Sequence, residues 1–179
     1  MTLDVDELLS AARDNTGPDD CGDEWFVEPL TVLTKALTDE ARLSEMGLAL
    51  TQQRLTALLA DRLRLRKYQA DHPEVTEREV TVAAEICGLP RTGSTLLHRL
   101  LASSPHVTST LSWETSYPLP FPGEGPGAEL RKQKAQDRYA MFMEMAPDFG
   151  DIHTIEWDGP EEDVIVLDPS ATDAPVGFN

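Results

Sequence analysis

The sequence contains few basic residues for its length. Of 179 residues, 15 are lysine or arginine and 32 are aspartate or glutamate, which gives a formal net charge of −17 at pH 7. Proteins bind nucleic acids through basic patches that neutralise the phosphates, so this charge balance argues against a nucleic-acid partner. An anionic ligand would have to be held by local backbone dipoles and a few cations, against the field of the whole protein.

The sequence also lacks the segments that export a protein or anchor it in a membrane. No apolar run approaches the roughly 20 residues that span a bilayer, and residues 1–6 are acidic, unlike a signal peptide. Only two cysteines are present, Cys21 and Cys87, in unlike contexts and without metal-ligand spacing. We therefore expect a cytoplasmic protein with reduced thiols and no transmembrane segment.

The turn between a predicted strand and a predicted helix is the most informative segment. Residues 80–87 alternate as a β-strand does, and a helical pattern begins after Gly93. Gly88 and Gly93 enclose four residues, the glycine spacing of a Walker A loop. Backbone N–H groups of such a loop and of the first helical turn converge on a phosphate. Ser94 stands where a Walker A loop has lysine, and Arg91 is the cation of the loop, so the pattern favours a nucleotide other than ATP.

These residues resemble the 5′-phosphosulfate-binding loop of sulfotransferases. Residues 90–95 read Pro-Arg-Thr-Gly-Ser-Thr and are followed by Leu-Leu-His-Arg-Leu-Leu-Ala. This is most similar to the bacterial and actinobacterial-type sulfotransferase family, whose loop reads Gly-x-Pro-Arg-Thr-Gly-(Ser/Thr)-Thr. Trp113-Glu114, residues 158–162 and the N-terminal helical region also resemble that family. The similarity covers about the first half of the family's length.

The resemblance implies that the protein transfers sulfuryl groups. Enzymes of this family move the sulfuryl group of 3′-phosphoadenylyl sulfate, their co-substrate, to an acceptor hydroxyl and need no metal ion. The expected acceptor is a hydroxyl on a small molecule, a lipid or a carbohydrate, and the sequence specifies neither the acceptor nor the oligomeric state. Because the family's later strands have no counterpart here, we expect a fragment, possessing little or no activity by itself.

The expected fold class is α/β. Apolar residues at helical spacing predict a helical N-terminal region over residues 1–75. Residues 76–179 are expected to form a partial sulfotransferase domain with a P-loop-like, three-layer parallel sheet that is apparently truncated. Residues 80–87 and 107–111 are its predicted strands, joined by the helix after the loop in a right-handed crossover.

Two more helices are expected in the second half of the chain. A Pro/Gly-rich loop over residues 117–127 precedes a predicted helix over residues 128–145. Residues 158–163 begin with an aspartate and continue with acidic residues, the pattern of a helix start.

The loop supplies the predicted binding residues. The backbone of Thr92, Gly93, Ser94 and Thr95, with the hydroxyls of Ser94 and Thr95, is expected to hold the 5′-phosphate of the co-substrate. Arg91 is expected both to bind the co-substrate and to act in catalysis, by stabilising charge on the oxygen that leaves the sulfur. Its role is electrostatic, since a guanidinium does not readily give up a proton.

The base that accepts the proton of the acceptor hydroxyl has two candidates. Glu114 follows the second predicted strand at its carboxyl end, where open α/β sheets bind ligands, and Trp113 is a possible neighbour that would raise its pKa. His153 is the alternative, because neutral imidazole suits proton transfer near pH 7.

Two other functions stay open at the level of sequence. One is a P-loop kinase or NTPase, against which Ser94 in place of lysine counts. The other is a non-catalytic helical interaction module in residues 1–75, attached to a degenerate anion-binding unit. The acidic residues at 156–163 match no calcium loop, so we expect no metal site there.

Overall fold

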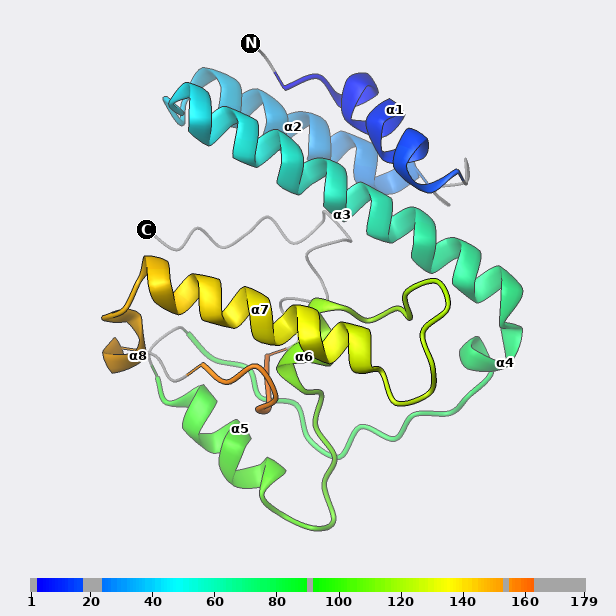
Figure 1. Ribbon diagram of the computed structural model, residues 1–179, viewed down its shortest axis with the longest axis vertical. Coiled ribbons are helices and arrows are strands. Elements are labelled where there is room, and N and C mark those ends of the chain that lie inside the picture. The colour runs from blue at the N-terminus through cyan, green and yellow to red at the C-terminus, as the bar shows by residue number, and fades with distance from the viewer. Residues whose placement is uncertain (1–2, 18–23, 90–91, 153–154, 163–179) are drawn as a thin grey trace. The chain divides into compact units, whose positions relative to one another are not determined.

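The structure, a computed structural model, describes residues 3–17, 24–89, 92–152 and 155–162 (Figure 1). The chain divides into two compact units. Among the described residues, the first unit contains those up to Arg78 and the second contains those from Glu79 onward.

The first unit is helical. Its elements are α1 (Val5–Thr16), a 3₁₀ turn η1 (Glu24–Phe26), α2 (Val27–Asp39), α3 (Glu45–Asp71) and the single turn α4 (Pro73–Thr76). The Asp4 carboxylate accepts hydrogen bonds from the backbone N–H groups of Asp6 and Glu7 and so starts α1. Gly17, with a φ of 78°, ends the same helix by donating its N–H to the carbonyl of Arg13.

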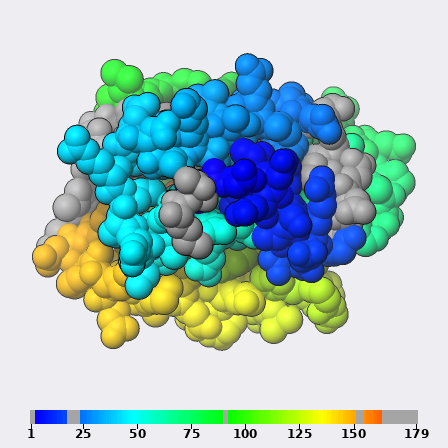
Figure 2. All heavy atoms as spheres, turned by 90° about the horizontal axis from the view of Figure 1, so that it is seen from above, coloured from blue at the N-terminus to red at the C-terminus, as the bar shows by residue number. Residues whose placement is uncertain are grey.

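A leucine-rich core joins the three long helices of this unit. In Figure 2 the atoms of α1, in dark blue, lie directly against those of α2 and α3, in lighter blue and cyan. In α1, Leu8, Leu9 and Ala12 are buried. Their partners in the core include Phe26, Leu30, Leu55, Leu59, Ala60 and Leu63.

The second unit consists of irregular chain and helices. Residues 79–89 run without regular structure to the loop, and α5 (Ser94–Ala102) follows. The chain continues through α6 (Ser112–Ser116), the Pro/Gly-rich loop, α7 (Glu129–Met145) and the single turn α8 (Phe149–Ile152). The predicted helix over residues 128–145 is thereby confirmed.

The predicted three-layer parallel sheet is wrong. No strand occurs among the described residues, and the β-bridge they contain joins Leu111 to Pro160 in the antiparallel sense. An alternating sequence favours an extended backbone, but a strand also needs a neighbour whose N–H and C=O groups complete the ladder. Residues 107–111 do not provide one for residues 80–87, and Val80 and Val82 stay 76% and 74% exposed.

The helix expected to begin at residue 158 is also not found in the described part of that segment. Residues 157–159 form a turn, Pro160 pairs in the bridge with Leu111, and Glu161 and Glu162 are irregular. The bridge places Pro160 beside another chain segment, and this tertiary pairing overrides the local preference of an aspartate followed by acidic residues.

Within the described residues, none of the helices combines the length and the apolar character needed to cross a membrane. Cys87 is an exposed free thiol, and Cys21 lies outside the described residues.

Candidate functional site

A tight hydrogen-bonded turn closes the loop before α5. The hydroxyl of Thr92 donates to the carbonyl of Leu89 over 2.6 Å. A Cβ at Gly88 would lie 3.1 Å from the hydroxyl oxygen of Thr92, closer than most Cβ contacts. Glycine at position 88 therefore allows the two ends of the loop to approach each other.

Gly93 sets the geometry at the start of α5. It is the N-cap residue, with a φ of 90° and a ψ of 14°, in the left-handed region that glycine reaches without strain. Its carbonyl accepts the N–H of Leu97 over 3.1 Å, which is the first hydrogen bond of the helix. The N–H groups of the first turn have no acceptor inside the helix and carry the positive end of its dipole. This end of α5 is chemically suited to an anion.

Thr92, Gly93, Ser94 and Thr95 therefore lie together where the sequence predicts the phosphate cradle. Thr92 and Gly93 are exposed, while Ser94 and Thr95 are half-buried. Arg91 and the alternative base His153 lie outside the described residues.

A second chain segment reaches the first turn of α5. The hydroxyl of Thr95 donates to a carboxylate oxygen of Glu162 over 3.1 Å. One turn further along α5, the Arg99 guanidinium lies 3.2 Å from the Glu156 carboxylate. Residues 155–162 are thus tied to α5 at two points, an arrangement that the sequence does not indicate because the partners are 67 residues apart in the case of Thr95 and Glu162.

Glu114, the first candidate for the base, serves as a helix cap in this structure. It is the third residue of α6, and its carboxylate accepts the backbone N–H of Leu111 over 2.8 Å. Glu114 is half-buried, and the next residue, Thr115, is buried. The carboxylate has acceptor capacity for several hydrogen bonds, so capping α6 is compatible with a further role in proton transfer.

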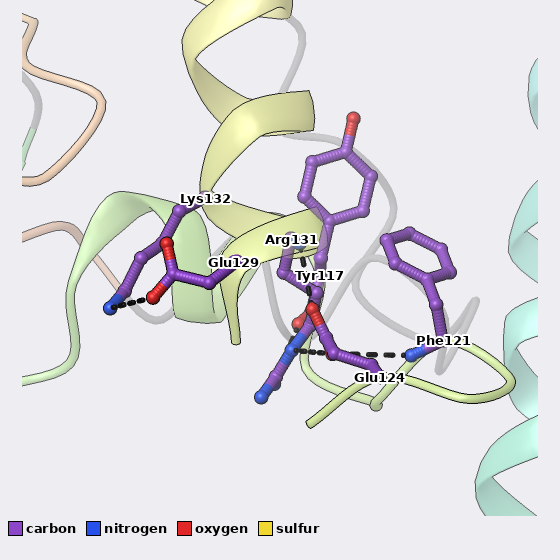
Figure 3. A network of polar contacts seen from close by, with 6 residues as sticks. All are labelled: Tyr117, Phe121, Glu124, Glu129, Arg131 and Lys132. Atoms are coloured by element: carbon purple, nitrogen blue, oxygen red, sulfur yellow. Dashed lines mark hydrogen bonds and ion pairs between the residues drawn. The ribbon is translucent and has the colours of Figure 1, made fainter. Parts of the chain in front are cut away.

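A buried ion pair fixes the Pro/Gly-rich loop to α7 (Figure 3). The Glu124 side chain is 1% exposed and lies 2.8 Å from Nε of Arg131, whose side chain is 16% exposed. Glu124 also accepts the backbone N–H groups of Arg131 and Phe121, over 2.9 and 3.3 Å. Arg131 in turn donates to the carbonyl of Tyr117 over 3.3 Å. One carboxylate therefore holds both sides of the loop and the first turn of α7.

Arg131 and its neighbour Lys132 also join α7 to α6. The guanidinium of Arg131 lies 5.2 Å from the ring centroid of Trp113, and the Lys132 ammonium lies 5.4 Å from it. These are cation–π distances. Trp113, which precedes the candidate base, is thus held against α7. The sequence gives no sign of this, because nothing in the residue pattern distinguishes Glu124 and Arg131 from the many other charged residues.

The surroundings of Glu124 lower its pKa. Burial alone would raise it, but the backbone N–H donors of Arg131 and Phe121, together with the charge of Arg131, outweigh burial and hold the pKa below the usual value for a glutamate. In an unfolded chain, glutamate has a pKa of about 4.3. A folded-state pKa below that value means that Glu124 stabilises the fold above the unfolded pKa and that this contribution is lost as the pH falls through the folded pKa.

We expect Glu124→Gln to lower the melting temperature near neutral pH and to reduce the further loss of stability between about pH 5 and pH 3. The reason is that glutamine keeps one acceptor oxygen but loses the charge that Arg131 faces. Thermal unfolding at both pH values, followed by circular dichroism, measures this. Glu129→Gln is the matched control, since that carboxylate is 85% exposed and 4.0 Å from Lys132. Equal pH dependence in the wild type and the Glu124 variant would show that the charge of Glu124 does not stabilise the fold.

Within the described residues, no group of three or more metal-ligating side chains comes together. The features that do come together are the glycine-capped start of α5, the Thr92–Leu89 hydrogen bond before it and the Glu162 carboxylate at its first turn. They define a class of protein with a glycine-capped helix start whose free N–H groups are chemically suited to an anion.

The comparisons with known proteins specify this class. A model of the sulfotransferase family matches residues 85–175, which include the loop, α5, α6 and α7. The chain belongs to the sulfotransferase family.

Two solved structures share its fold. The sulfotransferase STF1 from Mycobacterium tuberculosis H37Rv is 29% identical, with a TM-score of 0.76 over 95% of this chain and 47% of its own. The sulfotransferase STF9 from Mycobacterium avium is 23% identical, with a TM-score of 0.75 over 93% of this chain and 43% of its own, and shows the fold alone. The chain thus spans less than half the length of either. A search of curated proteins gave no significant match.

Proposed function

We propose that this protein binds 3′-phosphoadenylyl sulfate at the loop before α5 and transfers its sulfuryl group to a hydroxyl of an acceptor molecule. The observation that carries the proposal is the left-handed Gly93 at the N-cap of α5, within a segment that the sulfotransferase family model matches. In the proposed complex, the first-turn N–H groups and the hydroxyls of Ser94 and Thr95 hold the 5′-phosphate, as helix starts of this kind do.

The chemistry requires charge stabilisation and a proton acceptor. In the proposed reaction, the acceptor oxygen forms a bond to sulfur while the bond between sulfur and the 5′-phosphate oxygen breaks. The negative charge that collects on the departing oxygen is stabilised by the backbone of the cradle and by Arg91. The proton of the acceptor hydroxyl passes to Glu114 or to His153. The acceptor belongs to the small molecules, lipids or carbohydrates.

The residues around Glu114 support its assignment as the base. The carboxylate is held in place by the Leu111 N–H, and the neighbouring Trp113 is held by the cations of α7. A carboxylate fixed in this way is a suitable proton acceptor, because its orientation does not have to be selected during the reaction.

Calorimetric titration tests the proposed co-substrate. We expect 3′-phosphoadenosine 5′-phosphate, the product that remains after transfer, to bind in preference to ATP, because the loop lacks the lysine that contacts the outer phosphates of ATP. Preference for ATP would contradict the proposal in favour of a kinase or NTPase. Absence of binding by either nucleotide would point to an interaction module.

A further inference from the structure

The hydrogen bond between Thr95 and Glu162 affects how the proposed site binds the sulfuryl donor, 3′-phosphoadenylyl sulfate. Thr95 is the second residue of α5, at the end of the loop that the proposed function assigns to the 5′-phosphate. Its hydroxyl donates to Glu162 over 3.1 Å, and both residues are half-buried. The Glu162 carboxylate therefore takes the Thr95 hydroxyl, which in the proposed function binds the negatively charged 5′-phosphate.

Glu162 is held at this place by its own segment. The backbone of the segment is bonded to the residues before α6: Ser112 donates its N–H to the carbonyl of Gly159 over 2.8 Å, and Glu161 donates its N–H to the carbonyl of Thr110 over 3.1 Å. The N–H of Glu162 itself donates to the Glu161 carboxylate over 2.9 Å. The contact with Thr95 is thus made by an anchored residue.

Gly159 makes the turn before Glu162 possible. A Cβ at this position would come within 2.6 Å of the Glu156 carboxylate and 2.9 Å of its Cβ. Glu156 in turn pairs with Arg99 of α5. In Figure 1 this segment, drawn in orange, runs close to α5 and α6, in agreement with these hydrogen bonds.

The chemistry of a hydroxyl makes the two contacts exclusive. A threonine hydroxyl carries one proton and can donate it to one acceptor at a time. While Thr95 donates to Glu162, it cannot donate to a phosphate oxygen. The carboxylate and the phosphate also repel each other when both are charged. Donor binding through Thr95 therefore requires Glu162 to give up this hydrogen bond.

We propose that Glu162 is an inhibitory residue, which competes with the sulfuryl donor for Thr95 and has to be displaced when the donor binds. The proposal rests on the proposed function, since it takes the loop before α5 as the donor site. Glu162 lowers the affinity of the site for anions and makes donor binding depend on breaking its hydrogen bond with Thr95.

Calorimetric titration of the full chain with 3′-phosphoadenosine 5′-phosphate tests this. We expect Glu162→Ala to bind about fivefold more tightly than the wild type, the effect of a typical net hydrogen bond, and Glu162→Gln to bind more tightly as well, since it removes the charge. Asp158→Asn is the matched control: it removes one negative charge from an exposed residue of the same segment and should leave the affinity unchanged. In a Thr95→Ala background, the gain from Glu162→Ala should be smaller.

The outcomes separate this inference from the function on which it rests. Equal or weaker binding by both Glu162 variants, with normal binding by the wild type, would overturn the inhibitory role and leave the donor site intact. Binding by the Glu162 variants alone would support it in its strongest form. Absence of binding by the wild type and by both variants would overturn the proposed function itself, and the inhibitory role with it.

Discussion

Gly93→Ala is expected to weaken binding of 3′-phosphoadenosine 5′-phosphate by about tenfold or more. Gly93 has a φ of 90°, and a residue with a Cβ held in a sparsely populated backbone region is strained by about 1–3 kcal/mol. Each 1.4 kcal/mol corresponds to about a factor of ten in affinity. The free variant relaxes this backbone angle, which turns the first N–H groups of α5 away from the phosphate position, and binding then has to restore the strained conformation at that cost.

The space around Gly93 isolates this cause. A Cβ at Gly93 would meet no atom within 4 Å, so steric clash does not contribute and the backbone angle alone is tested. Gly125→Ala is the matched control, because that glycine also has open space around it but no left-handed φ. Calorimetry on both variants measures the difference. If the two substitutions have the same effect on affinity, the left-handed N-cap does not form the donor site.

Leu63→Ala is expected to destabilise the first unit by about 2–5 kcal/mol, the usual range for a leucine removed from a packed core. Leu63 is 0% exposed and belongs to the cluster that joins α3 to α1. Its side chain is replaced by a cavity, since the surrounding helices relax only in part.

The neighbouring exposed leucine provides the comparison for this prediction. Leu65 lies on the same helix but is 40% exposed, and Leu65→Ala should change the stability far less. Urea unfolding followed by the helical circular dichroism signal measures both. Similar destabilisation by the two substitutions would contradict the placement of the core on one face of α3.

The local parts of the fold could be predicted from the sequence. Asp4, with apolar residues at helical spacing after it, is sufficient to predict α1, because an N-cap and an apolar face act within a few residues. Gly93 predicts the start of α5 for the same reason. The loop and the candidate cradle are local features of this kind.

The parts that could not be predicted depend on partners distant in the chain. The alternation at Val80 and Val82 predicts an extended segment but not the neighbour that would make it a strand, and the described residues provide none. Glu162 and Thr95 are hydrogen-bonded although they are 67 residues apart in the chain, and no sequence pattern predicts such a pair. Glu124 and Arg131 are only seven residues apart, but the burial that makes their pairing important is visible only in the fold.

A crystal structure of the protein with 3′-phosphoadenosine 5′-phosphate would test the central claim most directly. We predict that the 5′-phosphate lies at the start of α5, with its oxygens within hydrogen-bond distance of the backbone N–H groups at Gly93, Ser94 and Thr95. A nucleotide bound elsewhere on the chain, with the start of α5 free of the phosphate, would contradict it.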